Sequence, residues 1–332
     1  MLNNKTILVT GGTGSFGMKF TEIVLKRFKP EKLIIFSRDE FKQHEMAKIF
    51  SPEKYPVRYF LGDVRDKERL FRAFEGVDYV IHAAALKQVP ALEYNPMEAV
   101  KTNVLGSDNI VDAAIDAKVK KVIALSSDKA VNPINLYGAT KLVAEKIFVA
   151  ANAYAGGRVK FAAVRYGNVV GSRGSIIPIF LDLEKSGVKE FPLTDERMTR
   201  FWITLEHGVE LVLKALTEVE GGEVFVPKIP SMRITDLARA IDPKCTFKMI
   251  GIRAGEKIHE TLISDDESRK VKVFQDCYVI LPQFFENPVI NQKYDKCPGV
   301  PEGFLFRSDK NEEWVTGKQL KKMIERIRLQ LK

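Results

Sequence analysis

The 332-residue sequence predicts an α/β fold, a doubly wound parallel sheet with a smaller, discontinuous C-terminal lobe. Short β-rich segments alternate with helical patterns through the first half of the chain, as in successive β-α-β units. These segments are apolar almost without interruption, which is typical of strands that helices cover on both faces. A glycine-rich turn joins the first segment to a helix, as in many sheets of this kind.

Six segments are expected to form the strands of the sheet, because each is a short apolar run bounded by turn signals. They are Thr6–Thr10, Lys32–Phe36, Val57–Asp63, Asp78–Ala84, Lys121–Ser127 and Lys160–Tyr166. A helical pattern runs from about Ser15 to Phe28 after the first strand, and further helix-like segments separate the later strands. Residues 1–170 are therefore expected to form the first domain.

The second half of the sequence is divided between the two lobes. Leu205–Leu216 has an amphipathic helical pattern and the strand-like GEVFVP follows it, so residues 200–227 are expected to return to the first domain. Residues 171–199 and 228–332 are assigned to the smaller lobe, which is expected to bind the substrate. A C-terminal helical pattern is expected to dock on the core or on a neighbouring subunit through Leu320, Met323, Ile324, Ile327 and Leu331.

Composition and charge argue against several classes of protein. The net charge is +9, but Lys and Arg are interspersed with Asp and Glu, so a small polyanionic ligand is favoured over nucleic acid. Three widely spaced cysteines and four scattered histidines form no motif of a disulfide framework or a metal centre. The N-terminus has no signal-peptide pattern and no apolar run is long enough to span a bilayer, so we expect a cytoplasmic protein without membrane contact.

Gly11, Gly14 and Gly17 form a GxxGxxG motif between the first strand and its helix. Glycine permits a tight turn and a close approach of the backbone to a pyrophosphate, which then sits at the helix N-terminus. Turns use glycine widely, but this motif has the preceding strand and following helix that a Rossmann dinucleotide-binding domain requires. The expected cofactor contacts of this turn are Gly11, Thr13, Gly14, Ser15, Phe16 and Gly17.

The second strand ends in FSRDE, where NAD-binding domains usually place an acidic residue against the ribose diol. Here Ser37 and Arg38 come first, and Lys42 follows one turn later. A guanidinium and a hydroxyl suit a 2′-phosphate better than a diol, so NADP is the predicted cofactor. Asp39 and Glu40 keep NAD as an alternative, and the segment can also be a solvated helix start capped by Ser37.

Later strand ends supply further predicted contacts, because ligands bind at the carboxyl ends of parallel strands. Asp63 and Val64, in GDVRD, are expected near the adenine. The motifs AAALKQVP and KTN, and the segment after the sixth strand, are expected to supply cofactor contacts from Ala85, Lys87, Asn103 and Val169.

The segment SSDKAVNPINLYGATK contains the candidate catalytic residues. Ser127, Asp128 and Lys129 follow the fifth strand, and Tyr137 and Lys141 are four residues apart, on one face of the next helix. An ammonium beside a phenol favours phenolate, so Tyr137 can act as a base, and Lys141 would also hold the nicotinamide ribose. The alternatives are a surface helix pair and a surface ion pair, but a position after a strand end favours catalysis.

Together, the motifs TGGTGSFG, GDVRD, HAAA and YGATK resemble those of the extended short-chain dehydrogenases/reductases, in the branch that modifies sugar nucleotides. RYGNVVGSRGSIIP, RMTRFWIT, VFVPKIPSM and GIRAGEKIHE narrow the resemblance, up to about Ser268, to the inverting UDP-N-acetylglucosamine 4,6-dehydratases of pseudaminic acid biosynthesis. In this family, retaining dehydratases carry Asp-Glu in place of Asp128-Lys129, and several other enzymes carry Met in place of Tyr137. Ser127 departs from the usual threonine.

The resemblance implies a homo-oligomer that acts on UDP-N-acetylglucosamine with NADP. Tyr137 would take the proton of the C4 hydroxyl as C4 is oxidised, which acidifies the C5 proton. Lys129, held neutral by burial, would take that proton, and Asp128 would protonate the departing C6 hydroxyl. The hydride then returns to C6, and protonation of C5 from the opposite face inverts it. The implied substrate contacts are Lys87, Asn168, Arg173, Ser175, Ile176, Arg200 and Arg253.

Other functions stay open at this point. A retaining UDP-sugar 4,6-dehydratase or a UDP-sugar 4-epimerase would share the fold, although an epimerase needs neither Asp128 nor Lys129. A non-catalytic, NADP-sensing regulator typically lacks the pair that Tyr137 and Lys141 form here. The sequence leaves the exact nucleotide sugar and the stereochemistry at C5 undecided.

Overall fold

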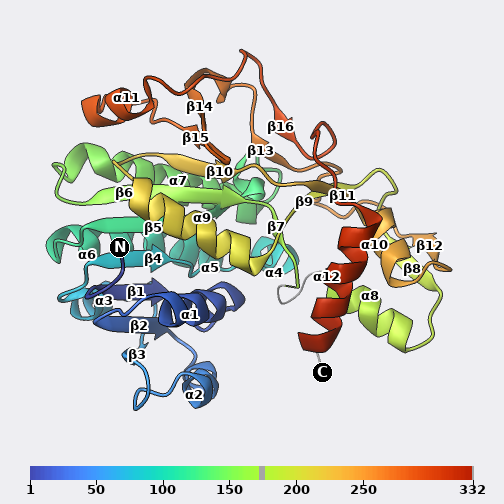
Figure 1. Cartoon of the computed structure of the whole chain (residues 1–332), viewed down its shortest axis with the longest axis horizontal. Coiled ribbons are helices and arrows are strands. Elements are labelled where there is room, and N and C mark those ends of the chain that lie inside the picture. The colour runs from blue at the N-terminus through green and yellow to red at the C-terminus, as the bar shows by residue number, and fades with distance from the viewer. Residues whose placement is uncertain (172–175, 331–332) are drawn as a thin grey trace.

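A nine-stranded sheet dominates the computed structural model, which describes residues 1–171 and 176–330 (Figure 1). From one edge to the other, the strand order is β14-β15-β10-β6-β5-β4-β1-β2-β3. Every neighbouring pair from β10 to β3 is parallel, and β15 and β14 add to β10 in antiparallel pairs. The predicted doubly wound α/β fold is therefore confirmed.

The strands of the sheet are short, apolar and mostly buried, as the sequence pattern predicts. Their bounds are β1 (Thr6–Thr10), β2 (Lys32–Ser37), β3 (Val57–Leu61), β4 (Tyr79–His82), β5 (Lys121–Ser127), β6 (Lys160–Tyr166), β10 (Val224–Pro227), β14 (Val271–Phe274) and β15 (Cys277–Ile280). β3 and β4 end earlier than predicted, because the chain leaves the ladder there for turns that carry functional residues.

Helices cover both faces of the sheet (Figure 1). Phe20 of α1 and Val209 of α9 belong to the apolar cluster of one face, and Leu70 of α3, Ile110 of α6 and Phe148 of α7 belong to that of the other. The helices are α1 (Ser15–Arg27), α2 (Glu40–Ile49), α3 (Lys67–Phe74), α4 (Val89–Tyr94), α5 (Pro96–Ala99), the π-helical turn η1 (Val100–Leu105), α6 (Gly106–Asp116), the 3₁₀ turn η2 (Asp128–Ala130), α7 (Leu136–Tyr154) and α9 (Leu205–Glu218).

The smaller lobe is built around its own apolar cluster. Leu320, Ile324 and Ile327 of α12 are buried in it, so the C-terminal stripe docks on this core, and Leu331 lies outside the described residues. The elements here are β7 (Asn168–Val169), α8 (Ile176–Lys185), β8 (Glu190–Leu193), β9 (Thr199–Ile203), β11 (Ser231–Arg233), α10 (Ile234–Ile241), β12 (Thr246–Met249) and α12 (Gly317–Gln330). Within residues 1–171 and 176–330, no helix is both long and apolar enough to cross a bilayer.

The chain after residue 228 does not stay in the smaller lobe. β14 and β15 form a hairpin that extends the large sheet, so the assignment of all of 228–332 to the smaller lobe is wrong for these strands. Without this hairpin, the edge of β10 would have unpaired backbone groups, and two short apolar runs joined by a tight turn satisfy them. Further elements of this region are β13 (Thr261–Ile263), η3 (Ser268–Lys270), α11 (Pro288–Tyr294) and β16 (Phe306–Arg307).

A buried guanidinium joins the sheet to α7 and to the C-terminal region. Arg165 of β6 is 1% exposed, and its Nε donates to Glu145 Oε2 of α7 at 3.1 Å. Its Nη1 and Nη2 donate to the Glu267 carboxylate, each at 3.0 Å, and Nη1 also donates to the Leu262 carbonyl of β13 at 2.9 Å. Burial favours the neutral form of Glu267, but Arg165 outweighs it and holds the pKa of Glu267 below its ordinary value.

This network predicts a large loss of stability on removal of its cation. Arg165→Met leaves Glu145 and Glu267 buried without a countercharge, which typically costs about 3–5 kcal/mol of unfolding free energy. Urea unfolding followed by circular dichroism would measure it. Lys67→Met, which removes one partner of the exposed Lys67–Asp112 ion pair, is the control and should leave the midpoint unchanged. An Arg165→Met midpoint equal to that of the wild type would contradict this role.

Candidate active site

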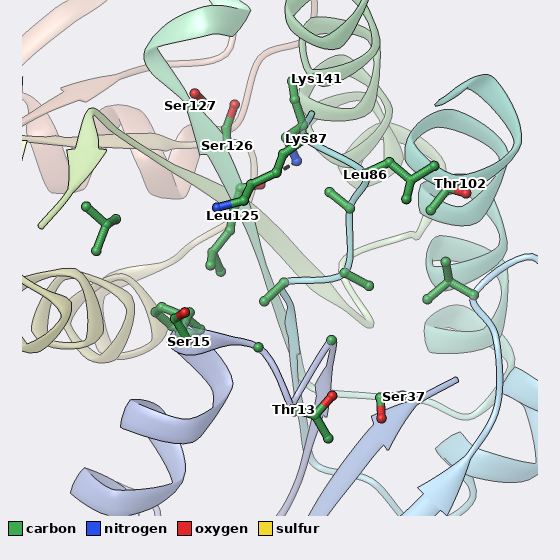
Figure 2. A pocket seen from close by; sticks show the side chains of 18 of the residues that line it. Thr13, Ser15, Ser37, Leu86, Lys87, Thr102, Leu125, Ser126, Ser127 and Lys141 are labelled. Carbon is green, nitrogen blue, oxygen red and sulfur yellow. Dashed lines mark hydrogen bonds between the residues drawn. The ribbon is translucent and has the colours of Figure 1, made fainter. Parts of the chain in front are cut away.

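A cavity of about 640 Å³ lies where the parallel strands end at their carboxyl side. It is lined by the turn between β1 and α1, by the ends of β2 and β4, and by the segments that follow β5 and β6. Figure 2 shows the side chains of Lys87 and Lys141 beside the end of β5, with Thr13, Ser15 and Ser37 at the opposite end of the view. The cavity therefore joins the glycine motif to the candidate catalytic segment.

Most of the predicted site residues line this cavity. Those that do are Gly11, Thr13, Gly14, Ser15, Phe16, Ser37, Arg38, Asp39, Lys42, Asp63, Val64, Ala85, Lys87, Ser127, Asp128, Lys129, Tyr137, Lys141, Asn168 and Val169. Those described residues that do not are Gly17, Glu40, Asn103, Ile176, Arg200 and Arg253. Arg173 and Ser175 lie outside the described residues.

The turn after β1 has the backbone geometry that only glycine adopts readily. Gly11 has a φ of 63°, and a Cβ there would come within 2.8 Å of the Ala84 backbone nitrogen. Gly14 then provides the N-cap of α1, and no side chain of the described residues caps the helix amides. These free amides, together with the positive end of the helix dipole, suit a phosphate group. Gly17 packs on the turn from within α1 and does not face the cavity.

The end of β2 places a cation and a hydroxyl on the cavity wall. Asp39, and not Ser37, caps α2, because its carboxylate accepts from the Lys42 amide at 3.0 Å. The Lys42 amine pairs with the same carboxylate at 2.5 Å. Ser37 is buried and accepts from Gln43, whereas the Arg38 side chain is 54% exposed and 3.7 Å from the Asp63 carboxylate. Arg38 is therefore accessible to a ligand.

Asn103 supports the cavity wall from behind. It lies in η1, is 1% exposed, and its amide makes hydrogen bonds of 2.8 and 2.9 Å with the backbone of Leu86 and one of 3.0 Å with Thr140. Asn103, predicted to contact the cofactor, does not line the cavity, and both ends of its amide hold the neighbouring loop. That loop carries Lys87, and both burial and the charge of Lys129 lower the pKa of Lys87.

The catalytic segment is held together by two caps and one close contact. Ser127 accepts from the Lys129 amide at 3.2 Å and donates to Asp128 Oδ1 at 2.6 Å, which fixes η2. Asn135 caps α7 by accepting from the Gly138 amide at 2.8 Å. A Cβ at Gly138 would lie 2.2 Å from the Lys129 carbonyl oxygen, so only glycine lets α7 pack this closely on η2.

Lys129 lies next to two buried carboxylates. Its Nζ is 3.2 Å from Asp128 Oδ1 and 3.5 Å from Glu260 Oε1, and the two acidic residues are 1% and 2% exposed. Burial alone would lower the pKa of the Lys129 amine, but these carboxylates raise it above its ordinary value. The prediction that burial holds Lys129 neutral is therefore wrong, because the charge of Asp128, joined by that of Glu260, outweighs burial.

The environment of Tyr137 also differs from the prediction. Burial raises its pKa, and the opposing effects come from the charge of Lys129 and a hydrogen bond with Ser127. Lys141 instead donates to the Leu125 carbonyl at 2.6 Å (Figure 2), and burial lowers its pKa to about 8. The cation that favours the phenolate is thus Lys129 and not Lys141.

The predicted substrate contacts are divided between the cavity and the smaller lobe. Asn168 lines the cavity, and its buried Oδ1 has no hydrogen-bond partner among the described residues. Arg200 is largely buried, donates to the carbonyls of Thr199 and Ile258, and has its Nε 3.7 Å from Glu260. Arg253 is 65% exposed on the loop before β13.

Several residues of the site were not predicted. Ser126 and Thr102 line the cavity with buried hydroxyl oxygens that have no partner among the described residues. The signal for Ser126 was its place at the end of a strand, one residue before Ser127. Tyr166, at the end of β6, gives the same signal. Glu260 ends the motif GIRAGEKIHE, which was a signal, but its distance along the chain from Lys129 gave no reason to pair the two.

The chain is similar to several known proteins. Residues 7–282 match the family model described as "Polysaccharide biosynthesis protein". The chain is 54% identical over 330 residues to a UDP-N-acetylglucosamine 4,6-dehydratase (inverting) of Campylobacter jejuni subsp. jejuni serotype O:2, and the match covers 98% of each chain. It is 46% identical over 292 residues to a UDP-glucose 4-epimerase of Rickettsia massiliae, with 84% of each covered. The solved structure of Pen from Bacillus thuringiensis is similar over 99% of both chains, with a TM-score of 0.89 and 36% identity.

Proposed function

We propose that this chain, which belongs to the Polysaccharide biosynthesis protein family, is a UDP-N-acetylglucosamine 4,6-dehydratase that inverts C5. The observation that carries the proposal is the ion pair of buried Asp128 with the partly exposed Lys129, which interacts with Tyr137 on the cavity wall. Removal of water across C5 and C6 needs an acid and a base together, whereas oxidation at C4 needs a hydride acceptor and, from the protein's side chains, only a base. The Campylobacter jejuni relative that bears this name covers 98% of the chain.

NADP is the proposed cofactor. The turn at Gly11 and the uncapped amides of α1 would receive its diphosphate. Ser37, Arg38 and Lys42 lie together on the cavity wall and would hold a 2′-phosphate, and Lys141 would hold the nicotinamide ribose. When bound, the nicotinamide supplies a reversible acceptor of hydride.

Tyr137 would accept the proton of the C4 hydroxyl. The Lys129 ammonium favours its phenolate, against the effect of burial. Oxidation at C4 then makes the C5 proton acidic, and this is the second proton that the site must remove.

The Asp128–Lys129 pair holds the protons that the elimination needs. Lys129 Nζ donates to Asp128 Oδ1 at 3.2 Å. Movement of one proton along this hydrogen bond converts ammonium and carboxylate into amine and carboxylic acid, with no change in the number of bound protons. The amine would take the C5 proton, and the acid would protonate the C6 hydroxyl as it leaves as water. Return of the hydride to C6, together with protonation of C5 from the opposite face, would give UDP-2-acetamido-2,6-dideoxy-β-L-arabino-hex-4-ulose.

Both lobes would contribute to substrate binding. The unpartnered Oδ1 of Asn168 favours a polar ligand at that end of the cavity. Arg253 is on an exposed loop that the hydrogen bond from Asn135 to the Gly255 carbonyl, 2.7 Å long, ties to α7, and it would bind the diphosphate. The proposal also keeps the expected cytoplasmic location and, from the family resemblance, a homo-oligomer that acts in pseudaminic acid biosynthesis.

A UDP-sugar 4-epimerase is the second candidate. The Rickettsia massiliae relative named as a UDP-glucose 4-epimerase is 46% identical, and the Tyr137–Lys141 pair would also suit oxidation at C4. An epimerase, however, has no use for an acid and a base at C5 and C6, where Asp128 and Lys129 would act. The product of the reaction distinguishes the two candidates.

Incubation of the purified protein with UDP-N-acetylglucosamine in D₂O, followed by NMR, tests the proposed reaction. We expect loss of the C6 hydroxyl and a 4-keto-6-deoxy sugar that carries deuterium at C5 and has the L-arabino configuration, because C5 is deprotonated and then protonated from the other face. A D-xylo product would keep the dehydratase and refute inversion. A C4 epimer with its C6 hydroxyl intact would favour the epimerase, and unchanged substrate in protein loaded with NADP would refute both.

Lys129→Met should lower turnover about 10²- to 10⁴-fold, the usual loss when a general base is removed, with cofactor content unchanged. Initial rates of product formation, measured on protein with matched cofactor content, would show this. Lys121→Met is the control, because Lys121 bonds the carbonyls of Leu216 and Thr217 and does not line the cavity. Undiminished inverting activity in Lys129→Met would rule out the amine as the C5 base.

Arg38→Ala should weaken NADP binding about 10- to 100-fold, as expected for loss of a charge-assisted hydrogen bond, and change NAD binding little. Calorimetric titration with each nucleotide would measure both dissociation constants. Arg72→Ala, on the exposed side of α3, is the matched control. Equal weakening of both nucleotides, or tighter binding of NAD than NADP by the wild type, would contradict NADP selectivity.

A further inference from the structure

Glu260 is a buried carboxylate with an incomplete set of partners. Its backbone is fixed on both sides by Ser308, since the Glu260 amide donates to Ser308 Oγ at 3.0 Å and its carbonyl accepts from the Ser308 amide at 2.9 Å. Oε1 is 3.5 Å from Lys129 Nζ and 3.7 Å from Arg200 Nε. Oε2 is buried and has no hydrogen-bond partner among the described residues. Such a group is costly in a protein interior and calls for an explanation.

Glu260 acts behind the cavity wall. It does not line the cavity, whereas Lys129 does, so the substrate would meet the amine and not this carboxylate. Arg200 is also absent from the wall, because its guanidinium is used on the Thr199 and Ile258 carbonyls and beside Glu260. The two residues thus form a charged layer beneath Lys129.

We infer that Glu260 is a positioning residue for Lys129, which it holds from behind the cavity wall and whose proton occupancy it controls together with Asp128. The inference rests on the proposed function, in which Lys129 exchanges a proton with C5.

The charges around Lys129 explain why a second carboxylate matters. Asp128 and Glu260 favour the protonated amine, and Tyr137 acts in the same direction. Arg200 opposes them, and Lys87 and Lys257 repel the ammonium as well. Without Glu260, one carboxylate would face three cations. The amine would then lose its proton at a lower pH, and the ion pair that precedes the proton transfer to Asp128 would be weaker.

Glu260→Gln tests this, because it keeps the shape of the side chain and removes its charge. In this variant, the falling limb of the pH profile of kcat/KM should move to lower pH by about 1 to 3 units, because the pair then loses its required proton at lower pH and loss of a nearby opposite charge lowers the pKa of an amine by that amount. Glu260→Asp keeps the charge and should restore the limb toward the wild type. Glu223→Gln, which neutralises a buried carboxylate elsewhere in the protein, is the control and should not move it.

A second measurement does not depend on turnover. The Lys129 side chain is 26% exposed, so its labelling by acetic anhydride, read by mass spectrometry over a range of pH, reports when the amine is free of its proton. The labelling midpoint should move to lower pH in folded Glu260→Gln by the same amount as the rate profile. An unmoved midpoint would overturn the inference, even if the protein proved to catalyse another reaction.

A kinetic result would also overturn the inference about Glu260. Loss of turnover at every pH in Glu260→Gln, with no recovery in Glu260→Asp, would make Glu260 a participant in the chemistry and not a positioning residue. A wild-type protein that formed no 4-keto product would refute the proposed function alone, because the labelling midpoints would still decide whether Glu260 controls Lys129.

Discussion

The buried Arg165 guanidinium is the constraint that joins the large sheet, α7 and the C-terminal region. It fixes α7 through Glu145, and it fixes the segment around β13 through the Leu262 carbonyl and Glu267. Glu145 lies one turn after Lys141, and its charge opposes the effect of burial on the pKa of that lysine. One charged group in the sheet therefore determines where α7 lies and how one of its functional groups ionises.

The same network connects the C-terminal region to the chemistry of the cavity. Glu260 precedes β13, whose Leu262 carbonyl accepts from Arg165, so the contact that seats β13 also brings Glu260 to Lys129. On the other side of Lys129, Gly138 allows α7 to approach its carbonyl oxygen. The position of Lys129 is thus set by packing from α7 and by charge from the C-terminal region, which are far apart in the sequence.

The sequence predicted those features that depend on residues close together along the chain. Strand ends and helix spacing located the cavity wall, because residues at the carboxyl ends of parallel strands must share one edge, and the family recognised from the motifs is confirmed. The sequence failed where the answer depended on a distant partner. Asn103 lies next to the cavity but behind its wall, where its amide bonds the backbone of Leu86, and spacing alone does not show that partner. The charge of Lys129 was missed because a pKa depends on every neighbour, and Glu260 could not be placed from its spacing.

The raised pKa of Lys129 keeps a proton in the site, and the proposed reaction needs that proton. An ammonium between carboxylates looks unsuited to accept a proton, but the reaction also needs a proton donor, and a neutral amine beside an ionised Asp128 would provide none. Two carboxylates keep one mobile proton in the pair, and its transfer from Lys129 to Asp128 creates base and acid at the same moment. If Glu260 were absent, the site would more readily lose this proton to solvent and with it the acid needed for the departing hydroxyl. Retention of a proton, and not activation of a single base, is thus the physical reason for placing a second carboxylate beneath the wall.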